Sequence, residues 1–293
     1  MRKTAALAIS LAGMATMGAG KPGGGASPPI APDHAKWMEP QSPARLYGST
    51  YLVGFGDLNV AMIRTSAGLI LIDGGVPEGV PEIAANLRQL GLSIKQVKLI
   101  LSTEPHYDHA GGIAGLARDS GATVIASAAG AAVLRTGGGD PDDPQAAWLD
   151  RFPGVAKVRA ARDGEVIRLG DTAVTAHATP GHTLGSISWS WKSCEGKDCR
   201  TIVFGSSLNP IAPDGWRFAD PAHRPFVDAF RTSFARVKAM RCDLLIPSHP
   251  ADDQADRLAR LHKTRTPNPF LDPRACRAYA QRAESALGKK LAE

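Results

Sequence analysis

Four possible metal ligands lie within six residues directly after an apolar run, and this cluster limits the fold more than any other feature of the sequence. The apolar run is Val97–Leu101, VKLIL, a pattern typical of a strand buried on both faces. It leads into STEPHYDHAGG, which contains Glu104, His106, Asp108 and His109. Open α/β sheets present their sites at the carboxyl ends of strands, and zinc binds imidazole and carboxylate. The sequence therefore predicts an α/β fold with a metal site at the end of this strand.

Two further histidines occupy matching positions. His182 lies in the tight turn TPGHT between two strand-like runs, and His249 follows the apolar run that ends at Pro247. Both are expected at strand ends, where one cleft would gather them with the first cluster. The remaining histidines lack this context and are expected to be ordinary polar residues: His34, His177, His223 and His262.

Strand-like and helix-like segments alternate in both halves of the chain, which favours one α/β domain with helices covering the sheets. Three short runs within 51–73 predict an antiparallel start. Further strands are expected at 122–127, 165–169, 173–178, 187–191, 201–204 and 243–247. Helices are expected at 81–90, 111–120, 130–135, 226–240 and from 271 onward. Residues 136–153 contain GGGDPDDP and predict a long exposed loop.

The N-terminus predicts an exported protein. A basic start and an uncharged apolar stretch form a secretory signal over residues 1–20, followed by a loosely attached arm over 21–44 and a single domain over 45–293. Loss of the signal lowers the formal net charge from +6 to +4. This mild charge, without a basic stripe, gives no indication of nucleic-acid binding. No run of 18 apolar residues follows the signal, so no membrane span is expected.

The motifs together resemble the metallo-β-lactamase superfamily. The run ExHxDH, with the later Gly-His and Ser-His-Pro, is similar to the family motif HxHxDH. The stretches LILIDGG at 69–75, RDGEVIRLG at 162–170 and HTLGSISW at 182–189 resemble class B β-lactamases of subclass B3. The resemblance covers about residues 36–285. It implies a four-layer αβ/βα sandwich that holds two zinc ions in a shallow groove at one edge.

The resemblance also implies roles for individual residues. The first zinc would be held by Glu104, His106 and His182, and the second by Asp108, His109 and His249. Asp108 would act in catalysis by orienting the nucleophile. Glu104 departs from the family, because most members have His at this position. Its extra negative charge makes zinc a poorer Lewis acid, so we expect lower zinc affinity or slower turnover than in a Glu104→His variant.

Position 207 separates the subgroups of the superfamily. Many of its hydrolases have a metal-bridging Asp here and other β-lactamase subclasses have a Cys, whereas this chain has Ser207. In subclass B3 this Ser helps to hold the substrate carboxylate, and Asn209 is a second expected substrate contact. Alternatively, both residues turn the chain after a strand, since Ser and Asn favour turns.

Four cysteines complete the set of residues with possible chemistry. Cys194 and Cys199 are close enough in sequence to join a hairpin, and Cys242 would tie the strand before His249 to the helix that carries Cys276. The resemblance supports both disulfides, and export permits them. A metal site made of all four cysteines would lack the usual paired CxxC spacing.

The function implied by the resemblance is zinc-dependent hydrolysis of the amide bond of β-lactam antibiotics, which confers resistance, by a periplasmic monomer. Penicillins, cephalosporins and carbapenems are the expected substrates. One alternative is another hydrolase of the same fold, a lactonase or thioesterase, against which the missing Asp at position 207 counts. A second is a non-catalytic exported protein that binds zinc or a ligand, against which the five retained ligands count.

Overall fold

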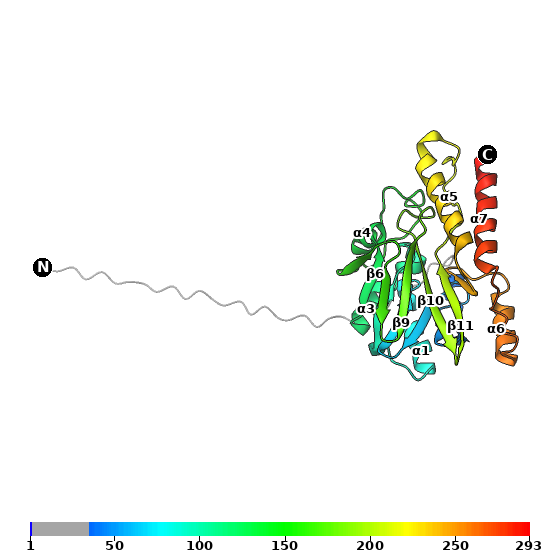
Figure 1. The fold of residues 1–293 in the computed structure, drawn as a ribbon. Helices are drawn as coiled ribbons and strands as arrows, with labels where there is room; N and C mark the ends of the chain where they lie inside the picture. Colours follow the sequence, from blue (N-terminus) through cyan, green and yellow to red (C-terminus); the bar gives the residue numbers. More distant parts are fainter. Residues whose placement is uncertain (2–34) are drawn as a thin grey trace.

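The protein is a four-layer sandwich in which two β-sheets pack face to face between two layers of helices (Figure 1). The computed structural model describes residue 1 and residues 35–293. The expected signal therefore lies, apart from Met1, outside the described residues, as does the expected arm up to residue 34. The αβ/βα sandwich implied by the sequence is confirmed.

The first sheet has seven strands in sequential order. They are β1 (Ala44–Tyr47), β2 (Thr50–Leu52), β3 (Ala61–Thr65), β4 (Gly68–Ile72), β5 (Val97–Leu101), β6 (Thr123–Ser127) and β7 (Val158–Ala161). Strands β2 to β4 pair antiparallel, as the sequence predicted, β1 adds antiparallel to β2, and β4 to β7 pair parallel. The predicted buried strand β5 lies between β4 and β6, so its carboxyl end opens at the middle of the sheet edge.

The second sheet has five strands, in the order β12, β11, β10, β9, β8. Their bounds are β8 (Val166–Leu169), β9 (Thr172–Ala178), β10 (Ile187–Glu195), β11 (Asp198–Gly205) and β12 (Leu244–Pro247). Strand β12 pairs parallel with β11, and the other pairs are antiparallel. Both β9 and β12 lead into segments that carry a predicted site histidine.

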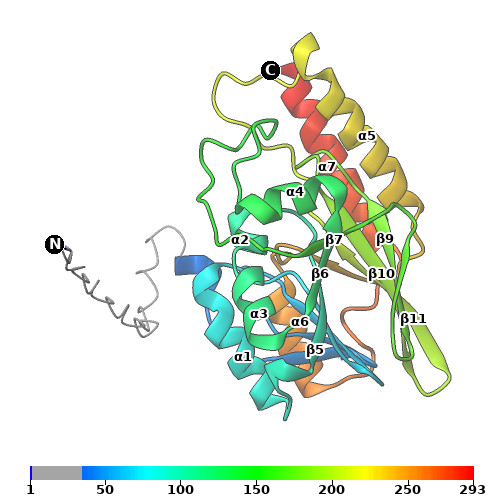
Figure 2. The ribbon, with the colours of Figure 1, turned by 90° about the vertical axis from the view of Figure 1, so that its left-hand side faces the viewer.

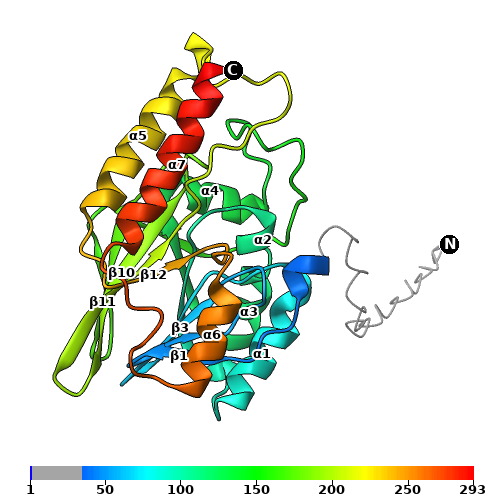
Figure 3. The same ribbon diagram turned by 90° about the vertical axis from the view of Figure 1, so that its right-hand side faces the viewer.

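Helices cover the outer face of each sheet. One group lies outside the first sheet (Figure 2): α1 (Val80–Gln89), α3 (Ile113–Ser120) and α4 (Ala128–Thr136). On the other side of the molecule, α5 (Arg224–Ala239) and α7 (Ala275–Ala292) run side by side, and α6 (Gln254–Lys263) lies toward the N-terminal end of α7, away from the C-terminus (Figure 3). In the part of the chain that the structure describes, no helix has the length and apolar character needed to cross a bilayer.

Alternation along the strands sorts the apolar side chains into the layers. In β4, Ile70 and Ile72 belong to the core between the sheets, whereas Leu69 and Leu71 pack with α1 and α3. In β11, Phe204 lies between the sheets, and the adjacent Val203 belongs to the apolar cluster under α5 and α7. Because strand side chains alternate between faces, runs of continuous apolar residues are needed where both faces are covered.

Strands β1 and β7 and helix α6 were not predicted from the sequence. Strand β1 has four residues and follows a proline-rich segment, and β7 exposes its two central residues, so neither shows a clear apolar pattern. Helix α6 is mostly polar, and Leu258 and Leu261 are the apolar residues that it buries. Each is an edge or surface element whose place depends on neighbours distant in the sequence.

Both expected disulfides are confirmed. Cys194 and Cys199 are directly opposite each other at the exposed end of the β10–β11 hairpin. Cys242 and Cys276 join the segment before β12 to the first turn of α7, within the buried cluster under α5 and α7. The second link connects residues 34 positions apart and fixes α7 beside the strand that leads to His249.

Candidate active site

The loop that carries the first ligand cluster is fixed to the end of β4 by Asp73. The Asp73 carboxylate accepts hydrogen bonds from the backbone amide of Thr103 at 2.7 Å and from its hydroxyl at 2.6 Å. Burial raises the pKa of Asp73 to about 7, although His109 and these hydrogen bonds act in the opposite direction. Sequence reasoning did not assign this role, although an acid at the end of the apolar run LILID is an available signal.

Two glycines allow the one-turn helix α2 (Tyr107–Ala110) to approach β4 closely. The amide of Gly74 donates to the carbonyl of His109 at 2.9 Å. A Cβ on Gly112 would lie 2.2 Å from the Gly74 carbonyl oxygen, so no side chain fits there. This close approach places Asp108 and His109, both on α2, beside the ends of the central strands.

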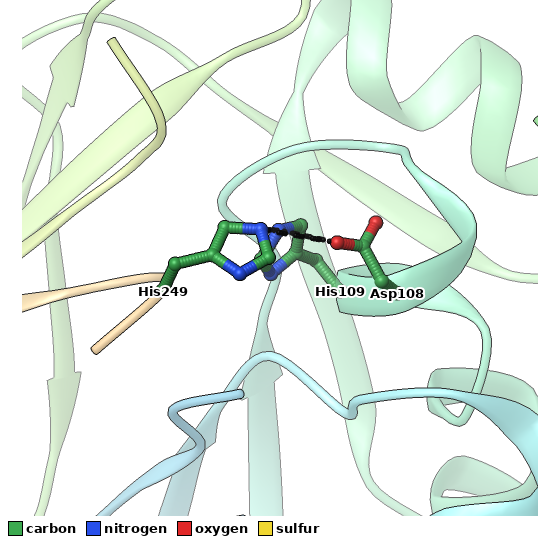
Figure 4. Close-up of side chains that lie close together, drawn as sticks. All are labelled: Asp108, His109 and His249. Carbon is green, nitrogen blue, oxygen red and sulfur yellow. Dashed lines mark hydrogen bonds and ion pairs between the residues drawn. The ribbon is translucent and has the colours of Figure 1, made fainter. Parts of the chain in front are cut away.

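Three of the predicted ligands meet at one point (Figure 4). Asp108, His109 and His249 each offer one ligand atom, and these atoms all lie within 4.8 Å of one another. The Asp108 carboxylate is 3.2 Å from His109 Nε2 and 3.1 Å from His249 Nε2. Burial alone would raise the pKa of Asp108, but His109 and His249 hold it well below its usual value. The donor set of one carboxylate and two imidazoles fits the ligand preferences of zinc.

His106 and His182 form a second pair beside this group. Their ring centroids are 4.9 Å apart, with the rings edge to face. His182 uses Nδ1 to donate to the backbone carbonyl of Asn209 at 2.8 Å, and His106 uses Nε2 to donate to Asp143 at 2.6 Å. One nitrogen of each ring, His182 Nε2 and His106 Nδ1, therefore stays available as a ligand.

Glu104 is fully buried, and its charge interacts with histidines of both groups of ligands. Its carboxylate accepts from the Ser207 amide at 3.0 Å and from the Ser207 hydroxyl at 2.6 Å, and it lies 3.0 Å from His109 Nε2. Burial would raise the pKa of Glu104, but His109, followed by His182 and His106, lowers it below its usual range. Glu104 is thus an ionised side chain at the centre of the cluster.

The two predicted substrate contacts have different surroundings. Ser207 is buried and bonds with Glu104 and Ser248, whereas Asn209 is exposed. Both line an open cleft of about 660 Å³ that reaches His249, and Tyr279 and Arg282 of α7 also line it. His249, one of the predicted ligands, therefore borders a space large enough for a small molecule.

The structure brings the six predicted ligands to one edge of the two sheets. Asp143, which bonds with His106, was not predicted. It comes from the acidic loop Asp140–Asp150, in which several exposed carboxylates surround it, and the sequence contains no signal that separates it from them.

Comparison with known proteins gives consistent relationships. The family model described as the metallo-beta-lactamase superfamily matches residues 53–249. A solved B3 metallo-beta-lactamase described as having an active-site glutamic acid is 49% identical, with 89% of this chain and 94% of that chain covered and a TM-score of 0.82. The Rm3 metallo-beta-lactamase is 41% identical, with 90% of this chain and 98% of that chain covered and a TM-score of 0.86.

A more distant relative is a hydroxyacylglutathione hydrolase of Bradyrhizobium sp. (strain ORS 278), 33% identical over 109 residues. That match covers 37% of this chain and 35% of the relative, so the chain spans about a third of the relative's length. The family model, by contrast, extends over more than half of the chain, from β2–β3 to the last predicted ligand. The chain therefore belongs to the metallo-beta-lactamase superfamily.

Proposed function

We propose that this protein is an exported zinc-dependent hydrolase that cleaves the amide bond of the β-lactam ring in antibiotics and so confers resistance. The observation that carries the proposal is the convergence of six ligand-type side chains beside an open cleft. Similarity over nearly the whole domain to solved B3 metallo-beta-lactamases supports the substrate class. We also infer that it acts as a periplasmic monomer, released from its signal after residue 20.

Two sets of residues would hold the metal. Glu104, His106 and His182 form the first, and Asp108, His109 and His249 form the second. Zinc bound here would supply a Lewis acid for the amide carbonyl and would lower the pKa of a bound water toward 7. Asp108, whose carboxylate lies beside His109 and His249, would orient the attacking water.

The protein's own residues would position the substrate. β-Lactam antibiotics carry a carboxylate, and the cleft beside His249 presents the Asn209 amide and the Arg282 guanidinium. Asn209 is exposed to this space, and Ser207 reaches it while its hydroxyl bonds with Glu104. We propose Ser207 and Asn209 as contacts of this carboxylate, in a cleft whose lining also carries two arginines, Arg257 and Arg282, and two acids, Asp252 and Asp253.

The proposed activity predicts zinc-dependent opening of a chromogenic cephalosporin. Purified protein should contain zinc and hydrolyse the reporter, should lose activity on dialysis against a chelator and should regain it with added zinc. Thioester and lactone substrates assayed in parallel test the other hydrolases of this fold. Zinc-dependent cleavage of a thioester without ring opening would support that alternative, and bound zinc with no hydrolysis would support a binding protein.

Export is supported by the two disulfides, which persist in oxidising compartments. The intact mass of protein recovered from a periplasmic fraction reports both the cleavage position and the oxidised cysteines. An uncleaved chain retained in the cytoplasm would contradict this part of the proposal.

Replacement of Glu104 by His is expected to raise zinc affinity about tenfold, or ~1.4 kcal/mol, because imidazole is a better zinc ligand and adds no negative charge. Competition with a chromophoric chelator measures the change, alongside turnover. Glu104→Gln is the matched variant, because it keeps an acceptor for Ser207 while removing the charge. Equal or weaker zinc loading and hydrolysis in Glu104→His, with the fold intact by circular dichroism, would refute the prediction.

A further inference from the structure

We infer that Asp143 is a positioning residue that fixes His106 for metal binding and links the loop over 137–154 to the site. The contact that carries this inference is the hydrogen bond from His106 Nε2 to Asp143 Oδ2, 2.6 Å long. Only 4% of each side chain is exposed, so the bond is shielded from competing water. The inference rests on the proposed role of His106 as a zinc ligand.

The bond determines which nitrogen of His106 is free. A carboxylate accepts only, so His106 Nε2 must carry the proton, and Nδ1 is left with its lone pair. The ring lies edge to face with His182, whose own Nδ1 is occupied by the Asn209 carbonyl. Ligating histidines commonly bond through their second nitrogen to a carboxylate or carbonyl, which fixes ring orientation and raises ligand basicity. Asp143 and the Asn209 carbonyl play these parts for His106 and His182.

Asp143 is itself held firmly. Its second carboxylate oxygen accepts from the backbone amide of Gln145 at 2.8 Å. Its backbone amide donates to the Asp140 carbonyl at 3.2 Å, and its carbonyl accepts from Ala146 at 3.0 Å. A carboxylate that is hydrogen-bonded on both oxygens has little rotational freedom. The Asp143 carboxylate therefore restricts the orientation of the His106 imidazole.

The loop that carries Asp143 is anchored at its two ends. Phe152 is buried in the cluster around α1, α3 and α4, and its amide donates to the Gly137 carbonyl at 3.0 Å. Between these ends the side chain of Asp143 reaches back to His106. The loop is thus fastened to the fold at its base and to the ligand set at its middle, so the position of the loop and the geometry of the first zinc set depend on each other.

Zinc titration separates this role from a general effect on folding. In Asp143→Ala, the dissociation constant for the zinc bound by the His106 set should rise about 10- to 100-fold, whereas the Asp108 set keeps its affinity. Asp143→Asn should be intermediate, because its amide oxygen still accepts from Nε2 without the charge. Asp142→Ala removes the exposed neighbouring acid and should leave both affinities unchanged.

A second readout does not depend on activity. Long-range ¹H–¹⁵N spectra of histidine-labelled, zinc-loaded protein report which His106 nitrogen is protonated. The wild type should show Nε2–H, and Asp143→Ala should show loss or broadening of that signal. Equal weakening of both zinc sites, or an unchanged His106 signal and unchanged affinity, would overturn the inference. A wild-type protein that binds no zinc would instead refute the proposed function. If the wild type binds a single zinc, the His106 signal alone tests the role of Asp143.

Discussion

The Asp108→Asn variant is expected to hydrolyse a cephalosporin with a kcat/KM about 10³-fold lower than that of the wild type, a loss of ~4 kcal/mol in transition-state stabilisation. Asp108 lies between two imidazoles at 3.1 and 3.2 Å, and those neighbours keep its carboxylate ionised. Asn has nearly the same shape, but its amide oxygen carries no charge and is a weak zinc ligand. The substitution therefore removes both a ligand and the group that orients the attacking water.

The measurement combines steady-state kinetics with metal content by mass spectrometry. We expect the variant to lose part of its zinc while its circular dichroism spectrum stays that of the wild type. Asp228→Asn is the matched control, because Asp228 is an exposed acid on α5 whose carboxylate pairs with Arg224 and Arg231 of the same helix. A variant at Asp108 with at least a tenth of wild-type kcat/KM would show that this carboxylate is dispensable.

Removal of the Cys242–Cys276 disulfide by paired Cys→Ala substitutions should lower the free energy of unfolding by about 4 kcal/mol. This link closes a loop of 34 residues and so restricts the unfolded chain more than the Cys194–Cys199 link, which spans 5. In the loop-closure model the shorter link contributes about 2 kcal/mol. Its exposed position at a hairpin end also leaves no cavity when the sulfurs are removed.

Urea unfolding curves of the two paired variants provide the comparison, and each pair serves as the control for the other. The zinc content of both proteins should be measured beside the curves, because bound metal adds to the apparent stability. Equal losses in the two variants, or a larger loss for Cys194 and Cys199, would contradict the loop-length argument.

The sequence predicted the ligand cluster because its chemistry is local. Glu104, His106, Asp108 and His109 lie directly after an apolar strand, and the backbone alone carries them to the sheet edge. His182 and His249 also follow recognisable strands. The partners that orient these ligands were less visible, because they come from distant segments. Asp143 lies 37 residues from His106, and only the folded loop distinguishes its carboxylate from the exposed acids around it.

The same contrast holds for the fold. Strand β5 has the predicted bounds because five apolar-rich residues between turn signals leave little choice. Helix α6, in contrast, is held by Asn59 in the loop between β2 and β3, whose side-chain amide donates to Gln254 at 3.1 Å, and this contact spans 195 residues. Ser207 shows what the sequence could not predict about the site. Its role as a substrate contact was expected from the resemblance, whereas its two hydrogen bonds to Glu104 depend on tertiary packing.

The candidate ligands come from both sheets, and this division has a mechanical consequence. Glu104 to His109 follow β5 of the first sheet, whereas His182 and His249 follow β9 and β12 of the second. The sheets are already joined there, because the Ile187 amide donates to the Thr103 carbonyl at 2.8 Å. An ion bound by ligands from both sheets would add a second link between them. A displacement of one sheet relative to the other would then change the distances between the ion and its ligands.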